Sequence, residues 1–350
     1  MKRRVVLVLF INIAAACCIL TACSQQTAPE IKRTILQFGT LIEITLYDVE
    51  PDHAEKALNQ LEKNYREYHA NWTPWEDSAL SKVNQQLKTG NTFNVPASVL
   101  PLIEQSIALS KTSQGLFNPA IGELIRLWQF HKHDDPDIQP PDEKLIIELV
   151  RKKPNMTNLV LNGTELRSSN TSAQLNFGAF AKGYSIDLSM QYLKKSGIHN
   201  AVINAGGDLS VIGHHGDRPW KIGIRHPRKN DVIAWLEARD NESIFTSGDY
   251  ERFYIHNGRR YHHILNPETG YPATGTTSVT VIHDNAGEAD AAATALFVAG
   301  PDKWPEIARS MKIHSVMLID NYGKIHLSPK MAERIHLKDE NSNITISEPL

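Results

Sequence analysis

An aspartate and a threonine, four residues apart in an alanine-rich run, are the residues of this chain best suited to binding a hard cation. Asp290 and Thr294 stand in the segment Glu288-Ala-Asp-Ala-Ala-Ala-Thr-Ala-Leu296. In a helix this spacing places both side chains on one face, one turn apart, with only small side chains between them. A carboxylate and a hydroxyl are oxygen ligands of the kind that Mg²⁺ prefers. The alternative is an aspartate in the first turn of a helix, favoured by the helix dipole, with the threonine merely packed behind it.

Two adjacent histidines precede a tight turn in the same part of the chain. His262 and His263 are followed by Ile-Leu and then by the turn Asn266-Pro-Glu-Thr-Gly270. Histidine titrates near neutral pH and is the side chain used most often as a general base. No third ligand stands at the spacing of a zinc motif, so a zinc site is not expected. The alternative is a solvated pair of histidines on an edge strand.

Four further blocks combine small residues with turns or helix starts: Phe117-Asn-Pro-Ala-Ile-Gly122, Leu175–Tyr184, Asn204-Ala-Gly-Gly-Asp208 and Thr246-Ser-Gly-Asp-Tyr250. Residues 175–184 end a predicted strand as a helix begins. Such a junction exposes carbonyls on one side and N–H groups on the other, suited to a cation and a pyrophosphate. The glycines of residues 204–208 permit positive φ and a close approach of the backbone. Taken singly, each block is also typical of an ordinary hairpin turn or helix start.

The first residues have the pattern of a secretory signal. Lys2, Arg3 and Arg4 precede Val5–Leu20, which is apolar except for Asn12. This run is shorter than the roughly 20 apolar residues of a transmembrane helix. The next residues, Leu20-Thr-Ala-Cys23, resemble the lipobox of bacterial lipoproteins, in which the cysteine receives acyl chains such as palmitate and becomes the new first residue. We therefore expect residues 1–22 to be a signal peptide, and residues 23–30 to be the lipidated Cys23 and a tether. In a Gram-negative host the domain would be a membrane-anchored protein of the cell envelope that faces the periplasm.

Charge and cysteine content exclude some classes of function. The formal net charge is −2, and removal of the three cations before the apolar run would lower it to about −5. This balance argues against nucleic acid as a partner. The other cysteines, Cys17 and Cys18, lie in the predicted signal peptide, so we expect no disulfide and no thiol chemistry in the mature domain.

Hydrophobic periodicity predicts an α+β fold. A hairpin about Gly39 is followed by predicted helices at 52–69, 98–112, 121–130 and 179–196. The second half is strand-rich, with predicted helices at 290–299 and 301–311 and a closing hairpin over 316–327. We expect one folded domain over residues 31–338 and a loosely held polar tail over 339–350. Rossmann and P-loop glycine motifs do not occur in the sequence.

In this order, the blocks resemble the ApbE family, the FAD:protein FMN transferases, which are often lipoproteins. The resemblance runs from Gly39-Thr40 and the Trp72–Asn84 segment to the last predicted strands. Its most specific parts are Asn204–Asp208, Thr246–Tyr250, His263-Ile-Leu-Asn-Pro-Glu-Thr-Gly270 and Asp290-Ala-Ala-Ala-Thr294.

The resemblance implies a helix-rich first half and a mixed or antiparallel sheet-rich second half around a flavin cleft. It also implies Mg²⁺-dependent transfer of FMN from FAD, the substrate, to a Ser or Thr hydroxyl of an acceptor protein, with release of AMP. The acceptors would be subunits of extracytoplasmic redox complexes. Two alternatives stay open: a Mg²⁺-dependent FAD pyrophosphatase that gives FMN and AMP, and a lipoprotein that binds FAD without chemistry.

Residue by residue, the resemblance implies a Mg²⁺ site made by the backbone oxygen of Ala179 with Asp290 and Thr294. Neighbouring residues on a strand point to opposite faces, and His263 opens the block that matches the family, so we expect His263 to face the flavin as the catalytic base and His262 to face solvent. The rate should then rise through a group titrating between about 6 and 7.5, as expected of a histidine. Asn118, Asn176 and Asn266 stand where the family commonly has Asp. The residues expected to contact FAD are Thr40, Trp75, Leu116, Phe117, Asn118, Lys182, Gly206, Gly207, Asp208, Ser247, Gly248, Asp249, His263, Ile264 and Asn266.

Overall fold

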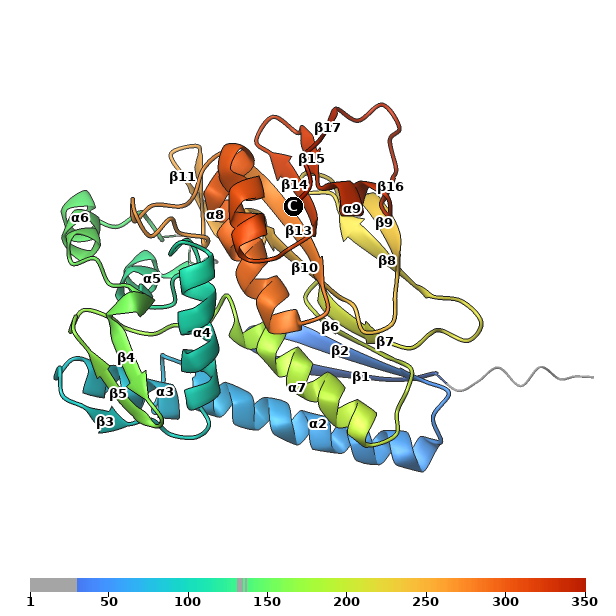
Figure 1. Cartoon of the computed structure of the whole chain (residues 1–350), viewed down its shortest axis with the longest axis horizontal. Helices are drawn as coiled ribbons and strands as arrows, with labels where there is room; N and C mark the ends of the chain where they lie inside the picture. The colour runs from blue at the N-terminus through green and yellow to red at the C-terminus, as the bar shows by residue number, and fades with distance from the viewer. Residues whose placement is uncertain (1–29, 131–134, 136) are drawn as a thin grey trace, which may run out of the picture.

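The computed structural model describes residues 30–130, 135 and 137–350 (Figure 1). The predicted signal peptide and Cys23 therefore lie outside the described residues. Within the part described, no helix has the length and apolar character needed to cross a lipid bilayer. The predicted α+β class is confirmed, with most helices in the first half and a second half rich in mostly antiparallel strands.

A nine-stranded sheet forms the centre of the fold. All neighbouring strands in it pair antiparallel except β15 and β17, which are parallel. In spatial order the strands are β1 (Glu30–Gln37), β2 (Thr40–Tyr47), β6 (Ala201–Ala205), β7 (Asp208–Ile212), β10 (Ser243–Gly248), β13 (Thr276–His283), β14 (Ser315–Asp320), β15 (Ile325–Leu327) and β17 (Ile344–Ile346).

The predicted hairpin about Gly39 is present as β1 and β2. Its two turn residues, Phe38 and Gly39, both have positive φ, 54° and 69°. Two left-handed residues in a row match the twist of the flanking strands, which is why such turns join antiparallel pairs. The turn leaves Gln37 opposite Thr40 at the end of the ladder, with Leu36 opposite Leu41 as the next pair.

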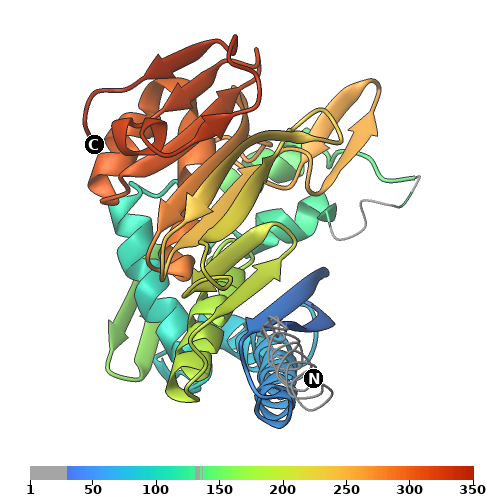
Figure 2. The ribbon, with the colours of Figure 1, turned by 90° about the vertical axis from the view of Figure 1, so that its right-hand side faces the viewer.

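Helices cover one face of the central sheet. α2 (Pro51–Trp72), α7 (Ala181–Lys195) and α8 (Ala286–Ser310) pack against one another there, with α4 (Leu100–Thr112) beside α8 (Figures 1 and 2). Sheet residues such as Ile44, Phe245 and Val281 share the main hydrophobic core with these helices. Burial of this apolar surface is the dominant stabilising contribution to the fold.

A second, three-stranded sheet covers the opposite face. It has the order β16 (His336–Leu337), β9 (Val232–Ala238), β8 (Trp220–Arg225), and α9 (Pro329–Ala332) lies with it. Ile222, Leu236 and Met331 pack there against side chains of the central strands. The middle strands are thus buried on both faces, and small hydroxyl side chains such as Ser210, Ser243 and Thr280 are buried among their apolar residues.

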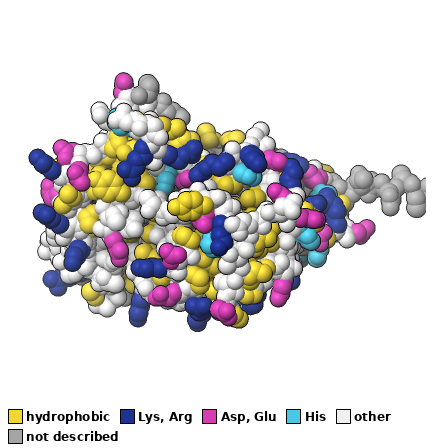
Figure 3. Space-filling view, turned by 90° about the horizontal axis from the view of Figure 1, so that it is seen from above, with side chains coloured by type: hydrophobic (Ala, Val, Ile, Leu, Met, Phe, Trp, Pro, Cys, Tyr) yellow, Lys and Arg dark blue, Asp and Glu magenta, His cyan; other side chains and the backbone are white. Residues whose placement is uncertain are grey.

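Two smaller parts complete the molecule. One is a three-stranded sheet in the order β3 (Phe93–Asn94), β5 (Glu165–Ser168), β4 (Leu159–Asn162), with α3 (Ala79–Leu87) preceding it in the chain. The other joins α5 (Gly122–Trp128), α6 (Glu143–Arg151) and the hairpin of β11 (Phe253–His256) and β12 (Arg259–His262) around an aromatic cluster. On the face seen in Figure 3, cationic and anionic side chains are interspersed.

One expectation about the C-terminal part was wrong. Residues 344–346 form a strand beside β15, and the N–H of Ile325 donates to the carbonyl of Asn343 (2.8 Å), so the segment after Lys338 is not a loosely held tail. The two helices expected at 290–299 and 301–311 are present within α8, where the non-helical Gly300 (φ 76°, ψ 177°) separates them, and the first of them begins earlier than expected, at Ala286. Because α8 begins at Ala286, Asp290 lies beyond its first turn, and its reading as a first-turn dipole residue is excluded.

Candidate active site

The N-terminus of α7 lies directly against α8. A Cβ added to Gly183 would lie 2.2 Å from the carbonyl oxygen of Ala286 and 2.9 Å from the Cβ of Asp290, so only glycine permits this approach. The N–H of Gly183 donates to Oδ2 of Asp290 over 3.0 Å. The contact satisfies one of the N–H groups that the first turn of a helix leaves without a partner. Ala179 lies two residues before the start of α7.

Asp290 is a buried carboxylate with 6% of its surface exposed. Burial, together with the charge of nearby Asp208, raises the pKa of Asp290 to about 7. The charge of Lys182 and the hydrogen bond from the Gly183 N–H act in the opposite direction. An anion held out of water in this way gains strongly from a cation placed next to it. Asp290 is therefore the natural charged ligand of this region.

Thr294 lies one turn further along α8, as its spacing predicts. Its Oγ1 is 3.3 Å from Oγ of Ser247 on β10, so the helix face that bears Asp290 and Thr294 is turned toward that strand. Among the residues described, no group of three or more His, Cys, Asp or Glu side chains is placed to hold a metal ion. A cation here would therefore bind one carboxylate together with neutral hydroxyl and carbonyl oxygens, a donor set that fits Mg²⁺.

Lys182 and Asp208 form an ion pair beside this face, in which the carboxylate is buried and the lysine is partly exposed. The other oxygen of Asp208 accepts the N–H of Thr246 over 2.6 Å, which ties the turn before β7 to β10. Burial lowers the pKa of Lys182, but the carboxylates of Asp208 and Asp290 outweigh it and raise that pKa. The ammonium is therefore charged at neutral pH.

The glycine turn at residues 206–207, just before Asp208, contacts the β1–β2 hairpin. Gly206 and Gly207 have φ of 68° and 105°. A Cβ on Gly206 would lie 2.4 Å from Oγ1 of Thr40, so Thr40 packs directly on this turn. Beyond it, Arg252 donates to the carbonyl of Phe38 over 3.2 Å. The structure thus brings Thr40 into contact with Gly206, next to Asp208.

The carboxylate of Asp249 is already occupied. Arg228, in the turn between β8 and β9, makes a bidentate ion pair with it at 2.6 and 2.7 Å. The backbone N–H of Asp249 donates to the carbonyl of Thr277 over 3.0 Å. Next to it, the ring of Tyr250 packs onto Gly248, where a Cβ would lie 2.5 Å from the ring. Asp249 therefore holds the β8–β9 turn in place, which makes it a poor candidate for a free base.

The two histidines are not placed as expected. His262 is 6% exposed, its Nε2 lies 2.9 Å from the carbonyl oxygen of Ala273, and its ring meets Phe297 edge-on, so the prediction of a solvent-facing His262 was wrong. His263 is partly buried just after β12, and its Nδ1 lacks a hydrogen-bond partner among the described residues. Burial first, then Arg252 and His262, lower the pKa of His263 to about 3. The ring is therefore neutral and able to accept a proton, but it does not titrate between 6 and 7.5.

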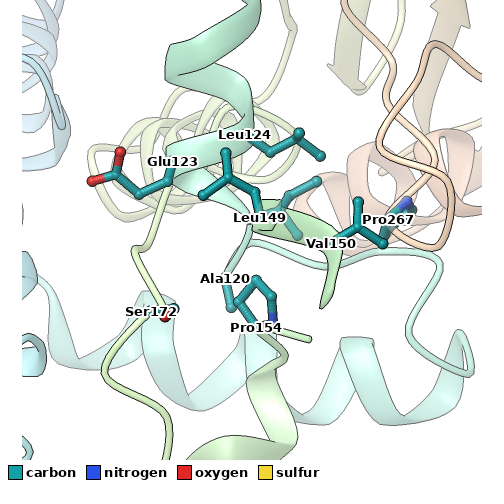
Figure 4. Close-up of a pocket in the computed structure, with 9 residues that line it drawn as sticks. Ala120, Glu123, Leu124, Leu149, Val150, Pro154, Ser172 and Pro267 are labelled. Atoms are coloured by element: carbon teal, nitrogen blue, oxygen red, sulfur yellow. The ribbon is translucent and has the colours of Figure 1, made fainter. Parts of the chain in front are cut away.

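The remaining candidates form the far side of the region. The ring of Phe117 lies 6.3 Å from that of Phe180, the residue before α7. Ile264 is buried and Trp75 is 45% exposed. Figure 4 shows a small apolar cavity between α5, α6 and the turn at Pro267; none of the described residues lining it is a candidate for flavin contact. The lining of this cavity includes neither Lys182 nor Asp290.

The family model of the ApbE family matches residues 38–318. The chain belongs to the ApbE family. Among ApbE relatives, an FAD:protein FMN transferase of Rhodobacter capsulatus is 39% identical over 308 residues, which are 88% of this chain but only 59% of the relative. Another from Treponema pallidum is 30% identical over 89% of this chain and 90% of its own length. The Rhodobacter relative is thus matched over less than two thirds of its length.

Solved ApbE structures share the fold. The ApbE protein of Thermotoga maritima superposes with a TM-score of 0.78 at 29% identity, covering 87% of this chain and 99% of that one. The flavin transferase ApbE of Vibrio cholerae gives a TM-score of 0.76 at 26% identity, over 88% and 99%.

The three asparagines Asn118, Asn176 and Asn266 make hydrogen bonds to the backbone. Asn118 donates from Nδ2 to the carbonyl of Pro154 (2.9 Å), and a carboxylate could not make this bond. Asn176 and Asn266 accept the N–H groups of residues 178 and 268, at 2.9 and 2.8 Å. Their amides thus keep the turns of the site in shape.

Two residues of this ApbE site were missed by the sequence analysis. Arg228 pairs with Asp249, and Asp187 of α7 accepts the N–H groups of Ala286 and Gly287 at the start of α8. No local pattern marks either residue, because each acts on a partner from a distant part of the chain.

Proposed function

We propose that this protein transfers FMN from FAD to a Ser or Thr hydroxyl of an acceptor protein, with Mg²⁺ as cofactor and AMP as the other product. The names of its ApbE relatives support the transferase activity. The observation that carries the proposal is the placement of the buried Asp290 carboxylate against Gly183, with Thr294 one turn away and Lys182 beside them.

Mg²⁺ bound by Asp290, Thr294 and the Ala179 carbonyl would neutralise charge on the pyrophosphate and act as a Lewis acid. The chain's own groups do the rest. Lys182 provides a charged donor for a phosphate oxygen, and the glycine turn at 206–207 lets the backbone approach it closely.

The proposed step is a phosphoryl transfer. The acceptor Oγ forms a bond to the phosphorus of the FMN half, and the bond from that phosphorus to the bridging oxygen breaks. AMP leaves with the bridging oxygen. The hydroxyl proton passes to His263, whose neutral ring is in the protonation state a base requires.

The products of FAD separate this proposal from its alternatives. Full-length protein is incubated with FAD and Mg²⁺, with and without a purified, FMN-free redox-subunit domain of the class that carries FMN on Ser or Thr when mature. AMP together with a flavinylated domain supports the transferase. AMP with free FMN in both reactions identifies a pyrophosphatase, and unchanged FAD identifies a binding protein without chemistry.

We also propose that lipidated Cys23 anchors the domain to the membrane, with acceptors among extracytoplasmic redox subunits. The lipobox-like Leu20-Thr-Ala-Cys23 supports this. β1 begins at Glu30 and ends at the turn beside Thr40, about 26 Å further on at about 3.3 Å per residue. The site would thus be held away from the point of attachment. Cys23→Ser should release the protein from membranes washed at alkaline pH; a variant that stays bound would contradict the anchor.

A further inference from the structure

Asp187 of α7 caps the N-terminus of α8. Its Oδ1 accepts the N–H of Ala286 and its Oδ2 accepts the N–H of Gly287, both over 2.8 Å. These are the first two residues of α8, whose N–H groups have no acceptor within their own helix. A carboxylate at that position also interacts favourably with the positive end of the helix dipole.

The cap is reciprocal. Asp290 of α8 accepts the N–H of Gly183 in the first turn of α7, while Asp187 of α7 accepts from the first turn of α8. On each helix the donor and the acceptor are four residues apart: Gly183 and Asp187 on one, Ala286 and Asp290 on the other. Between them, Gly183 touches the carbonyl of Ala286 directly. Four groups on two helices thus form one closed contact.

The contact made by Asp187 is not needed merely to cap α8, because another residue already caps that helix. Asn285 already caps α8, with its side-chain oxygen 2.8 Å from the N–H of Glu288. Asp187 adds a link to a second helix, α7, which carries Lys182 and begins two residues after Ala179. Burial raises the pKa of Asp187 to about 6, and the two N–H groups it accepts oppose the shift, so the carboxylate is ionised at neutral pH.

We propose that Asp187 is a positioning residue for the cation site: it fixes the register of α8 on α7, so that Asp290 and Thr294 face the Ala179 carbonyl and Lys182. The inference rests on the proposed function, because it assumes that these oxygens bind Mg²⁺. Asp187 itself touches neither the cation nor the flavin; it acts through the backbone of Ala286 and Gly287.

The test measures binding of Mn²⁺ alone, a paramagnetic substitute for Mg²⁺, to full-length protein by electron paramagnetic resonance. The main variant is Asp187→Asn, in which the amide keeps the shape but turns an NH₂ toward one of the two N–H donors. The matched control is Asn285→Ala, which removes a cap from the same helix without breaking the link to α7. Asp290→Ala reports on the cation site itself.

We expect Asp187→Asn to weaken Mn²⁺ binding tenfold or more and to raise the Mg²⁺ concentration for half-maximal FMN transfer, with kcat largely restored at saturating Mg²⁺. Asn285→Ala should lower the melting temperature but keep Mn²⁺ affinity within twofold of wild type. If Asp187→Asn is too unstable to titrate, Asp187→Glu, which keeps the charge and shifts the carboxylate by one methylene, should show the same loss.

The outcomes distinguish the positioning role of Asp187 from the existence of the cation site at Asp290. Mn²⁺ affinity within twofold of wild type in the Asp187 variant, with binding lost in Asp290→Ala, would overturn the positioning role and leave the cation site intact. Equal losses in Asp187→Asn and Asn285→Ala would reduce Asp187 to an ordinary cap and also overturn the proposal. Wild-type protein that binds no Mn²⁺ at Asp290 would overturn both the cation site and the inference.

Discussion

Lys182 of α7 and Asp208 at the start of β7 form an ion pair in which Asp208 is almost completely buried. The two residues are 26 positions apart in the chain, and Asp290 is close enough to influence the pKa of the lysine. The site therefore contains two buried carboxylates and one ammonium before any ligand binds. This imbalance favours a cation.

Lys182→Met should destabilise the protein at pH 7, because it leaves Asp208 buried without its cation. Breaking a buried pair costs about 3–5 kcal/mol, and the partial exposure of Lys182 places the expected loss at the lower end. The double variant Lys182→Met, Asp208→Asn should recover part of this loss. Urea unfolding of the two singles and the double gives the coupling energy, and strictly additive effects would show that the pair does not interact.

Asp290→Asn should abolish Mg²⁺-dependent turnover and yet stabilise the metal-free protein. The folded-state pKa is raised to about 7, so the contribution of Asp290 to stability is greatest below pH 4 and falls as pH rises toward 7. At pH 8 the variant should therefore be more stable than wild type by about 1 kcal/mol or more.

Thermal melts with and without Mg²⁺ check the Asp290 prediction. Wild type should gain stability from Mg²⁺ and the variant should not. Thr294→Ala should show a smaller loss, since it removes a neutral ligand. A variant that still melts higher in Mg²⁺ would place the cation elsewhere.

His263→Ala should lower FMN transfer by about a hundredfold or more, the usual range for loss of a general base. Binding of FAD, followed by quenching of its fluorescence, should persist. Because burial holds the pKa of His263 near 3, the ratio of the two rates should stay constant from pH 5 to 8. A wild-type inflection between pH 6 and 7.5 that the variant lacks would show that the pKa in the working enzyme is higher.

His262→Ala should lower stability more than catalysis. The variant loses the bond to the Ala273 carbonyl and the edge-on contact with Phe297, and it leaves that buried carbonyl unpaired. We expect a loss of about 1–3 kcal/mol in the free energy of unfolding, with kcat within a fewfold of wild type. A large drop in kcat without any loss of stability would give His262 a direct part in the reaction.

Local patterns in the sequence were sufficient for the α+β class, the hairpin about Gly39 and the shared helix face of Asp290 and Thr294. Each of these depends on residues within a few positions of one another, because helix and strand repeats place side chains at regular intervals. The alternation rule failed at His262 and His263, since β12 ends at His262 and the chain then turns. Which histidine is buried is decided by the helix residue Phe297, 35 positions later in the chain.

By itself, the sequence determined which residues are candidates for the chemistry: a carboxylate and a hydroxyl on one face of a helix, a lysine at a helix start, and glycines in tight turns. Only the tertiary structure decided their partners. Asp290 meets Gly183 across 107 residues, Asp187 meets Ala286 across 99, and Arg228 meets Asp249 across 21. Such pairs have no periodic signature, because they arise where the path of the chain brings separate elements together. Burial at those points sets the protonation of Asp290 and His263, since the free energy of a charge depends on the water that the fold removes.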